Sequence, residues 1–144
     1  KNAFAAIPLL VSFIPMLMDT GGNCGSQSST LIIRGIALGE IRFSDLFRVM
    51  FKEFRVSLIV GVVLALANGL RILIMYRNAG LALVIGLSLV ATVIISKLIG
   101  CLLPLFAKKL HMDPAIMASP LITTLVDTCS ILIYFNIATR IFQL

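Results

Sequence analysis

The sequence predicts an all-α membrane protein, a polytopic bundle of helices that crosses the lipid bilayer several times. Its 144 residues are 60% hydrophobic and 12% charged, with a mean hydropathy of +1.10. Soluble domains are roughly half apolar and a quarter charged. Apolar segments near or above the roughly 20 residues that span hydrocarbon alternate with short polar turns. We therefore expect one multi-pass membrane domain over residues 1–144, in the inner or plasma membrane, and no cleavable secretory signal.

Four helical segments are expected from apolar periodicity and from the positions of glycine and proline. The predicted boundaries are 2–38, 44–76, 80–110 and 113–142. A glycine-rich stretch near 19–25 predicts a break in the first segment. The second begins with phenylalanines at helical spacing between basic residues, which is typical of a helix lying at the membrane surface. The last begins at Asp113 as N-cap, with Pro114 in the first helical position.

The basic residues predict the orientation of the chain and its surroundings. Five lie from Arg34 to Arg55, and Lys108 and Lys109 precede the last helix. By the positive-inside rule both groups belong to the cytoplasmic side, which leaves the turn at 76–80 and the C-terminus outside. The net charge of +6 is then explained by topology and the lipid bilayer. We expect no nucleic-acid partner, because no soluble domain carries a basic face.

A carboxylate lies deep within the last predicted helix. Asp127 is near its middle, where a charged side chain costs at least about 2.5 kcal/mol on insertion scales, so it needs water, an ion or a partner. Ser119, Thr123, Ser130 and Tyr134 recur every three or four residues around it and share its helical face. Hydroxyls alone would suit hydrogen bonding between helices. A polar stripe centred on an acid favours an ion path.

Oxygen and amide side chains also gather in the stretch DTGGNCGSQSST, residues 19–30. Four polar side chains in and just beyond it share one helical face: Asn23, Gln27, Thr30 and Arg34. Oxygen ligands without sulfur suit a hard cation such as Mg²⁺ or Ca²⁺. Gly21, Gly22 and Gly25 permit either close helix approach or a local break that frees backbone carbonyls. The alternative is tight packing, with the amides joining neighbouring helices.

The other polar residues predict structural roles. The three cysteines, Cys24, Cys101 and Cys129, are odd in number and lie in apolar context, which favours packing over disulfides or a soft-metal site. We expect Lys97 to extend towards the cytoplasmic interface; the alternative is that it neutralises an acid or gates a path. His111 belongs to a solvated turn, and Glu53, between Lys52 and Arg55, to a surface ion pair.

An enzyme is a weaker interpretation. The tripeptide at residues 19–21 is that of aspartic proteases, and Asp19 with Asp127 would supply an acid pair. Here the tripeptide follows an apolar helix, and it occurs once. We therefore expect a protein that is not an enzyme.

Two long segments, PMLMDTGGNCGSQSSTLIIRGIALGEI and MDPAIMASPLITTLVDTCSILIYFNIA, resemble the membrane domain of the MgtE family of magnesium transporters and channels. The resemblance covers nearly the whole chain. It implies a homodimer of five-helix domains, with a pore along the twofold axis between the glycine-rich helix and the last helix. It also implies a metal site of Asp127, Thr123 and Ser119. The pore-lining residues would be Asn23, Ser26, Gln27, Gly22, Thr124, Ser130 and Asp19.

The chain departs from the family pattern in two ways. It has Ser119 where many relatives have Asn, and Ser26 where some have Asn. We expect no counterpart within these residues of the family's first membrane helix, which was either lost or removed or lies outside this sequence, or of the cytosolic N-terminal and cystathionine-β-synthase domains. A separate first helix or a separate regulatory protein is therefore a candidate partner.

The predicted function is transport of Mg²⁺, with other divalent cations possible, through a pore at a homodimer interface. A single Asp127 supplies a charge of −1, whereas two copies supply the −2 that balances a divalent ion. The alternatives are a structural or accessory membrane subunit whose polar stripes only join helices, and a transporter or exporter of another divalent cation.

Overall fold

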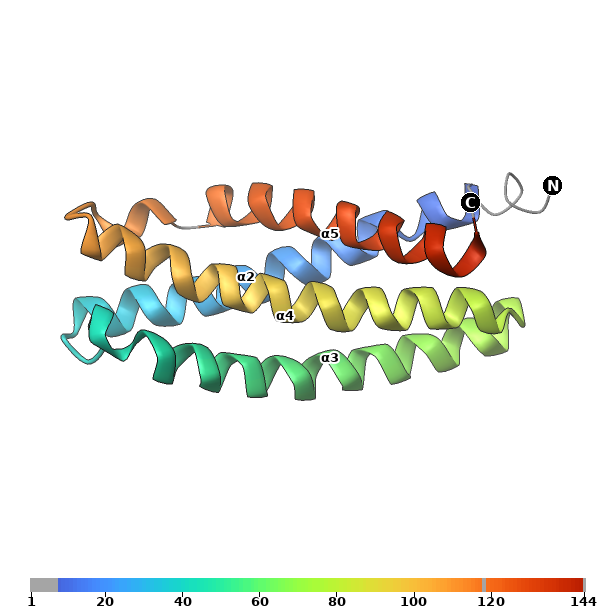
Figure 1. Cartoon of the computed structure of the whole chain (residues 1–144), viewed down its shortest axis with the longest axis horizontal. Coiled ribbons are helices and arrows are strands. Elements are labelled where there is room, and N and C mark those ends of the chain that lie inside the picture. Colours follow the sequence, from blue (N-terminus) through green and yellow to red (C-terminus); the bar gives the residue numbers. More distant parts are fainter. Residues whose placement is uncertain (1–7, 118, 144) are drawn as a thin grey trace.

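The computed structural model describes residues 8–117 and 119–143, and within them every long element is an α-helix and no strand occurs. The long helices are α2 (Ile14–Ala37), α3 (Leu46–Tyr76), α4 (Ala79–Lys109) and α5 (Ser119–Phe142), with two short 3₁₀ helices, η1 (Phe43–Asp45) and η2 (Pro114–Met117). They form an elongated bundle (Figure 1). Phe43–Tyr76, Ala79–Lys109 and Pro120–Phe142 are long and apolar enough to cross a membrane. The predicted all-α membrane fold is confirmed.

The first predicted helix has its interruption in a different place. Residues 8–12 are helical, a turn follows at Phe13, and α2 then runs without interruption to Ala37. The break expected near 19–25 is therefore wrong. The new helix begins around Pro15, which is tolerated in a first turn because the amide it lacks would be unpaired there. The glycines stay helical and serve close packing instead.

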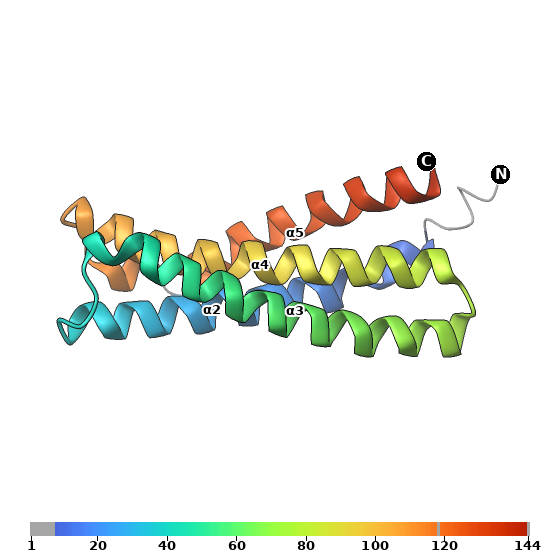
Figure 2. The same ribbon diagram turned by 60° about the horizontal axis from the view of Figure 1, so that its bottom comes forward.

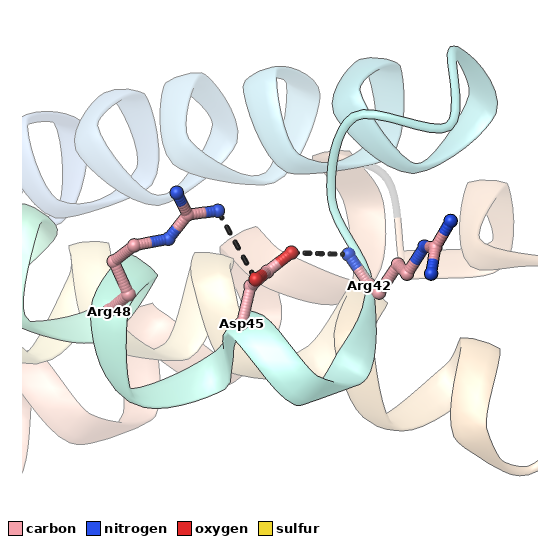
Figure 3. Close-up of polar contacts among 3 residues, drawn as sticks. All are labelled: Arg42, Asp45 and Arg48. Carbon is pink, nitrogen blue, oxygen red and sulfur yellow. Dashed lines mark hydrogen bonds and ion pairs between the residues drawn. The ribbon is translucent and has the colours of Figure 1, made fainter.

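The surface stretch before the second span is continuous with α3. Asp45 accepts a hydrogen bond from the backbone N–H of Arg42 at 3.0 Å and pairs with the Arg48 guanidinium at 3.2 Å. Figure 3 shows the Asp45 carboxylate between these two groups, with the Arg42 side chain turned away. This acid satisfies a free amide where the chain enters the helix and holds a cation there.

The last predicted helix is divided. The Asp113 carboxylate accepts the N–H of Ala115 at 3.0 Å, so it caps a turn as expected, but this turn is η2. The continuous helix α5 begins only at Ser119, so the predicted single helix over 113–142 is wrong. Pro120 in the first turn of α5 explains the division, because proline has no N–H to donate to the carbonyl of a preceding turn.

The helix α4 is the centre of the bundle and packs against α2, α3 and α5. One apolar cluster gathers around Leu81, Ile85 and Leu89 with Leu17 and Tyr134. A second lies towards the other end: Ile32, Ile36, Cys101 and Leu105. By contrast α3 touches mainly α4 and exposes most of its apolar side chains. A lipid environment accounts for that surface.

The turns divide between the two ends of the bundle. The 38–45 loop and the turn between α4 and α5 lie at one end, and the turn between α3 and α4 and the C-terminal end of α5 lie at the other (Figures 1 and 2). Both basic regions are thus at the same end, as the positive-inside rule requires. That this end is cytoplasmic stays a prediction.

Candidate ion-conducting site

Glycines let α2 pass closely between α4 and α5. A Cβ at Gly21 would lie 2.7 Å from Val126 Cγ1 and 2.9 Å from Thr92 Cγ2. At Gly25 it would lie 2.7 Å from Ile122 Cγ2, and Gly100 of α4 packs directly on the Gly25 carbonyl. Small residues at such crossings allow backbones to approach within a membrane. Of the two roles expected for the glycines, close approach is the one that the structure shows.

Asp127 lies beside this crossing. Val126, its neighbour in sequence, faces Gly21 and Gly25, and a Cβ at Gly22 would lie 3.0 Å from Thr123 Cγ2, one turn before Asp127 on α5. Asp127 is partly buried, and its Oδ1 is fully enclosed with no hydrogen-bond partner among the described residues. A buried carboxylate oxygen normally has a partner, so this one is suited to receive an external donor.

A polar face runs along α2 on the surface of the chain. Asp19, Asn23, Gln27, Thr30 and Arg34 are exposed, and the Asn23 amide donates to the Asp19 carboxylate at 3.4 Å. An open groove of about 550 Å³ follows this face and is lined by Asn23, Ser26, Gln27, Thr30 and Leu31. Membrane helices do not present such groups to lipid, because each unpaired polar group there is costly.

The polar stripe of α5 divides into two parts. Ser130 is 2% exposed and lies against Gly21, while the buried Tyr134 hydroxyl donates to the Leu10 carbonyl at 2.6 Å. Ser130 thus lies inside the chain, because Gly21 allows that part of α5 to pack onto α2. That Ser130 lines a pore stays a prediction. Thr123 and Asp127 remain at the edge of the contact.

Two other predicted residues have different surroundings. Thr124 is exposed, and its hydroxyl donates to the Pro120 carbonyl at 2.9 Å, one turn earlier. The side chain of Ser119 lies outside the described part of the structure.

Two charged residues, Glu53 and Lys97, lie in environments that differ from the predicted ones. Glu53 does not form a surface ion pair with Lys52 or Arg55. Instead its carboxylate accepts a hydrogen bond from the hydroxyl of Ser28 on α2, and Ser28 is fully buried. Lys97 is 6% exposed, so it does not extend to the interface.

A signal for the position of Glu53 was present in the sequence. Glu53 shares a helical face with Val49, Ser57 and Gly61, and this is the side of α3 that packs against the bundle. Arg55, two residues after Glu53, lies on the opposite side of the helix. The small residues one and two turns later, Ser57 and Gly61, mark this buried face better than the basic neighbours do.

No group of three or more His, Cys, Asp or Glu side chains that would hold a metal lies within residues 8–117 and 119–143. Cys24 and Cys101 are buried free thiols and Cys129 is partly buried, as expected for packing residues. A site at Asp127 therefore needs further ligands from hydroxyls, water or a second copy.

Comparison with known proteins gives the family. Residues 14–137 match MgtE, a family described as divalent cation transporters. The chain belongs to the MgtE family. The magnesium transporter MgtE of Bacillus subtilis strain 168 is 40% identical over 139 residues, which cover 96% of this chain and 31% of that protein. As a member of this family, the chain is a multi-pass protein of the plasma membrane.

Two further MgtE relatives show the same pattern. The magnesium transporter MgtE of Thermus thermophilus is 36% identical over 99% of this chain and 32% of its own length. That of Enterococcus faecalis is 35% identical over 91% of this chain and 29% of its own length. The chain thus spans about a third of the MgtE proteins it matches, the part that contains the glycine-rich helix and Asp127.

Proposed function

We propose that this chain forms a path for Mg²⁺ across the membrane, with the Asp127 carboxylate as its central cation-binding group. The observation that carries the proposal is the enclosed, unpartnered Oδ1 of Asp127 beside the glycine crossing of α2. In hydrocarbon such an acid is expensive and marks an ion pathway by default. The MgtE family and the names of the relatives favour Mg²⁺ among divalent ions.

The proposed working unit is a homodimer. The polar face of α2 is exposed in one chain, and a lipid-facing position would leave its amides and hydroxyls unpaired. A second copy related by a twofold axis would cover this face and would add a second carboxylate. Two Asp127 side chains give a charge of −2, which matches a divalent ion, and closed twofold dimers are the commonest oligomers.

Within this path the ion stays largely hydrated. Mg²⁺ loses water reluctantly and is usually held by one or two carboxylates through its remaining waters. Asp127 would accept hydrogen bonds from those waters, with Thr123 and Ser119 as oxygen neighbours along α5. Along α2, the amides of Asn23 and Gln27 and the Ser26 hydroxyl would form hydrogen bonds with the waters of the ion. Gly22, which has no side chain, would leave room for these waters.

The ends of the path have different chemistry. Asp19 lies one turn before Asn23, at the end that the positive-inside rule places outside, where its charge would attract cations. Thr124 is exposed beside Thr123, where it would meet the second copy. In this proposal the protein acts as a transporter or channel and not as an enzyme.

Flux measurements test the proposal. The purified chain in liposomes should pass Mg²⁺ to an internal indicator, and Asp127→Asn, which removes the charge and nearly preserves the shape, should reduce the rate to that of empty liposomes. Thr139→Ala, an exposed hydroxyl change on the same helix, is the control. Equal flux in Asp127→Asn and the parent protein would refute Asp127 as the ion site. Absence of flux in both would favour a structural subunit.

A further inference from the structure

An apolar groove opens between α3 and α4 at the end of the bundle that carries the basic turns. It has a volume of about 340 Å³ and is lined by Phe47, Met50, Phe51, Phe54 and Leu98. Phe47 is 84% exposed and Phe51 62% exposed. Every lining residue is apolar, so the groove suits a hydrocarbon chain.

Cations border this groove along one side of α3. Arg48, Lys52 and Arg55 follow at spacings of four and three residues, so they form a ridge on the face next to the phenylalanines. The Arg55 guanidinium lies 5.0 Å from the centroid of the Phe51 ring, which places a positive charge directly over a groove residue.

Asp45, the acid three residues before Arg48, already has two partners. Asp45 holds the Arg48 guanidinium at 3.2 Å and also accepts the backbone N–H of Arg42 (Figure 3). The Arg48 side chain is still largely exposed, and a guanidinium has five N–H donors, so donors remain for another anion. The ridge therefore keeps a net positive charge.

The length of α3 places this ridge in the headgroup layer. Its 31 residues give a length of about 46 Å at 1.5 Å per residue, whereas the hydrocarbon core is about 30 Å thick. The first ten residues account for about 15 Å of the difference. Residues 56–70 contain no charged side chain, so hydrocarbon begins just beyond Arg55. The end of the groove at Phe54 thus borders the hydrocarbon, while Arg48 and Arg55 lie at the level of the lipid phosphates.

We propose that this groove and ridge bind an anionic phospholipid of the cytoplasmic leaflet, with an acyl chain on the phenylalanines and the headgroup phosphate at Arg48 and Arg55. Charge complementarity selects the anionic lipid, because each cation near the surface contributes to attraction of such lipids. A second copy docked through the same face would bring two basic ridges together, which repel. The lipid therefore fits this surface better than another copy does.

The site lies next to a contact with the proposed ion-path helix. Glu53, between Lys52 and Arg55 in sequence, accepts the hydrogen bond from Ser28 of α2. Lipid bound at the ridge would thus hold the turn of α3 that positions α2. This consequence rests on the proposed function, whereas lipid binding does not.

Quenching by brominated lipids tests the binding site directly. The chain contains no tryptophan, so Phe51→Trp supplies a single reporter in the groove, and Leu66→Trp, exposed further along α3, supplies a reporter away from the cations. Each is placed in phosphatidylcholine vesicles containing a minor fraction of lipid brominated on its acyl chains, either phosphatidylglycerol or phosphatidylcholine. Phe47→Trp is a second groove reporter if Phe51→Trp fails to fold.

At the groove reporter, quenching should show that phosphatidylglycerol associates severalfold more strongly than phosphatidylcholine. At Leu66→Trp the two lipids should quench equally. The ratio of the two association constants at the groove is the quantity compared between variants. Adding Arg48→Gln with Arg55→Gln should reduce this ratio, by at most about fivefold per arginine. Arg71→Gln with Arg140→Gln, which removes the same charge from the other end of the bundle, should leave it unchanged. Equal quenching by the two lipids, or a preference that survives in the Arg48 and Arg55 variant, would overturn the proposal. So would an absence of quenching by either lipid, which would mean that protein covers the groove.

Discussion

The Ser28 hydroxyl of α2 donates a hydrogen bond to the carboxylate of Glu53 on α3. Ser28 is fully buried and Glu53 half-buried. The helix α4 packs on the same turn of α2, since a Cβ at Gly100 would lie 3.1 Å from Ser28 Cβ. The hydrogen bond thus joins α2 to α3 where α2 packs on α4. It favours the rotation of α2 that leaves Asn23 and Gln27 exposed.

The first prediction concerns this contact. Glu53→Ala should lower the free energy of unfolding by about 2 kcal/mol, because it leaves the buried Ser28 hydroxyl without its acceptor. Glu53→Gln keeps an acceptor oxygen and should cost less. Urea unfolding in detergent micelles measures both, with the exposed Glu40→Ala as control. If Glu53→Ala unfolds at the same urea concentration as Glu40→Ala, the contact does not stabilise the bundle.

The second prediction concerns the glycine crossing. Gly25→Ala places a methyl group 2.7 Å from Ile122 Cγ2 and should destabilise the protein by about 1–3 kcal/mol through overpacking. Gly69→Ala, whose added Cβ would meet nothing closer than 3.9 Å, should be neutral or stabilising by up to about 1 kcal/mol, because alanine is the better helix former. Thermal unfolding of both variants provides the comparison. Similar midpoints for the two would contradict the close packing of α2 against α5.

The third prediction concerns ion binding. Millimolar Mg²⁺ should raise the unfolding midpoint of the parent protein, because a ligand that binds only the native state stabilises it. Asp127→Asn should abolish this rise and should keep a cooperative transition without Mg²⁺. A variant at the other acid of the path, Asp19→Asn, should retain most of the rise. An undiminished Mg²⁺ effect in Asp127→Asn would place the binding site elsewhere.

The fourth prediction concerns orientation. A cysteine at Asn78, in the turn between α3 and α4, should react with a membrane-impermeant maleimide from outside the cell, whereas one at Ser44 should react only after permeabilisation. Both are introduced with the three natural cysteines changed to alanine. We expect this pattern because the basic turns lie at the opposite end of the bundle from Asn78, and basic loops stay on the cytoplasmic side. The reverse labelling pattern would invert the topology.

The sequence by itself determined the membrane class, the number of long helices and the residues that set its family. Apolar length and charge placement are properties of the bilayer as solvent, and they act on each segment separately. The prediction that Asp127 binds the ion has the same basis, since an acid in the middle of a membrane helix is costly. The sequence also predicted a structural role for Gly21, Gly22 and Gly25, but it allowed either close helix approach or a break in the helix.

Only the tertiary structure decided which way each side chain faces. The stripe of α5 had one periodicity in sequence, yet Ser130 is buried against Gly21 while Thr123 and Asp127 are only partly buried. The contact with α2 is centred on Ile122 and Val126, so it covers one edge of the stripe more than the other. Glu53 and Lys97 have the sequence context of surface residues. Glu53 is half-buried because α2 brings Ser28 to it, and Lys97 is buried because α4 lies at the centre of the bundle. Helical periodicity does not specify which helices become neighbours.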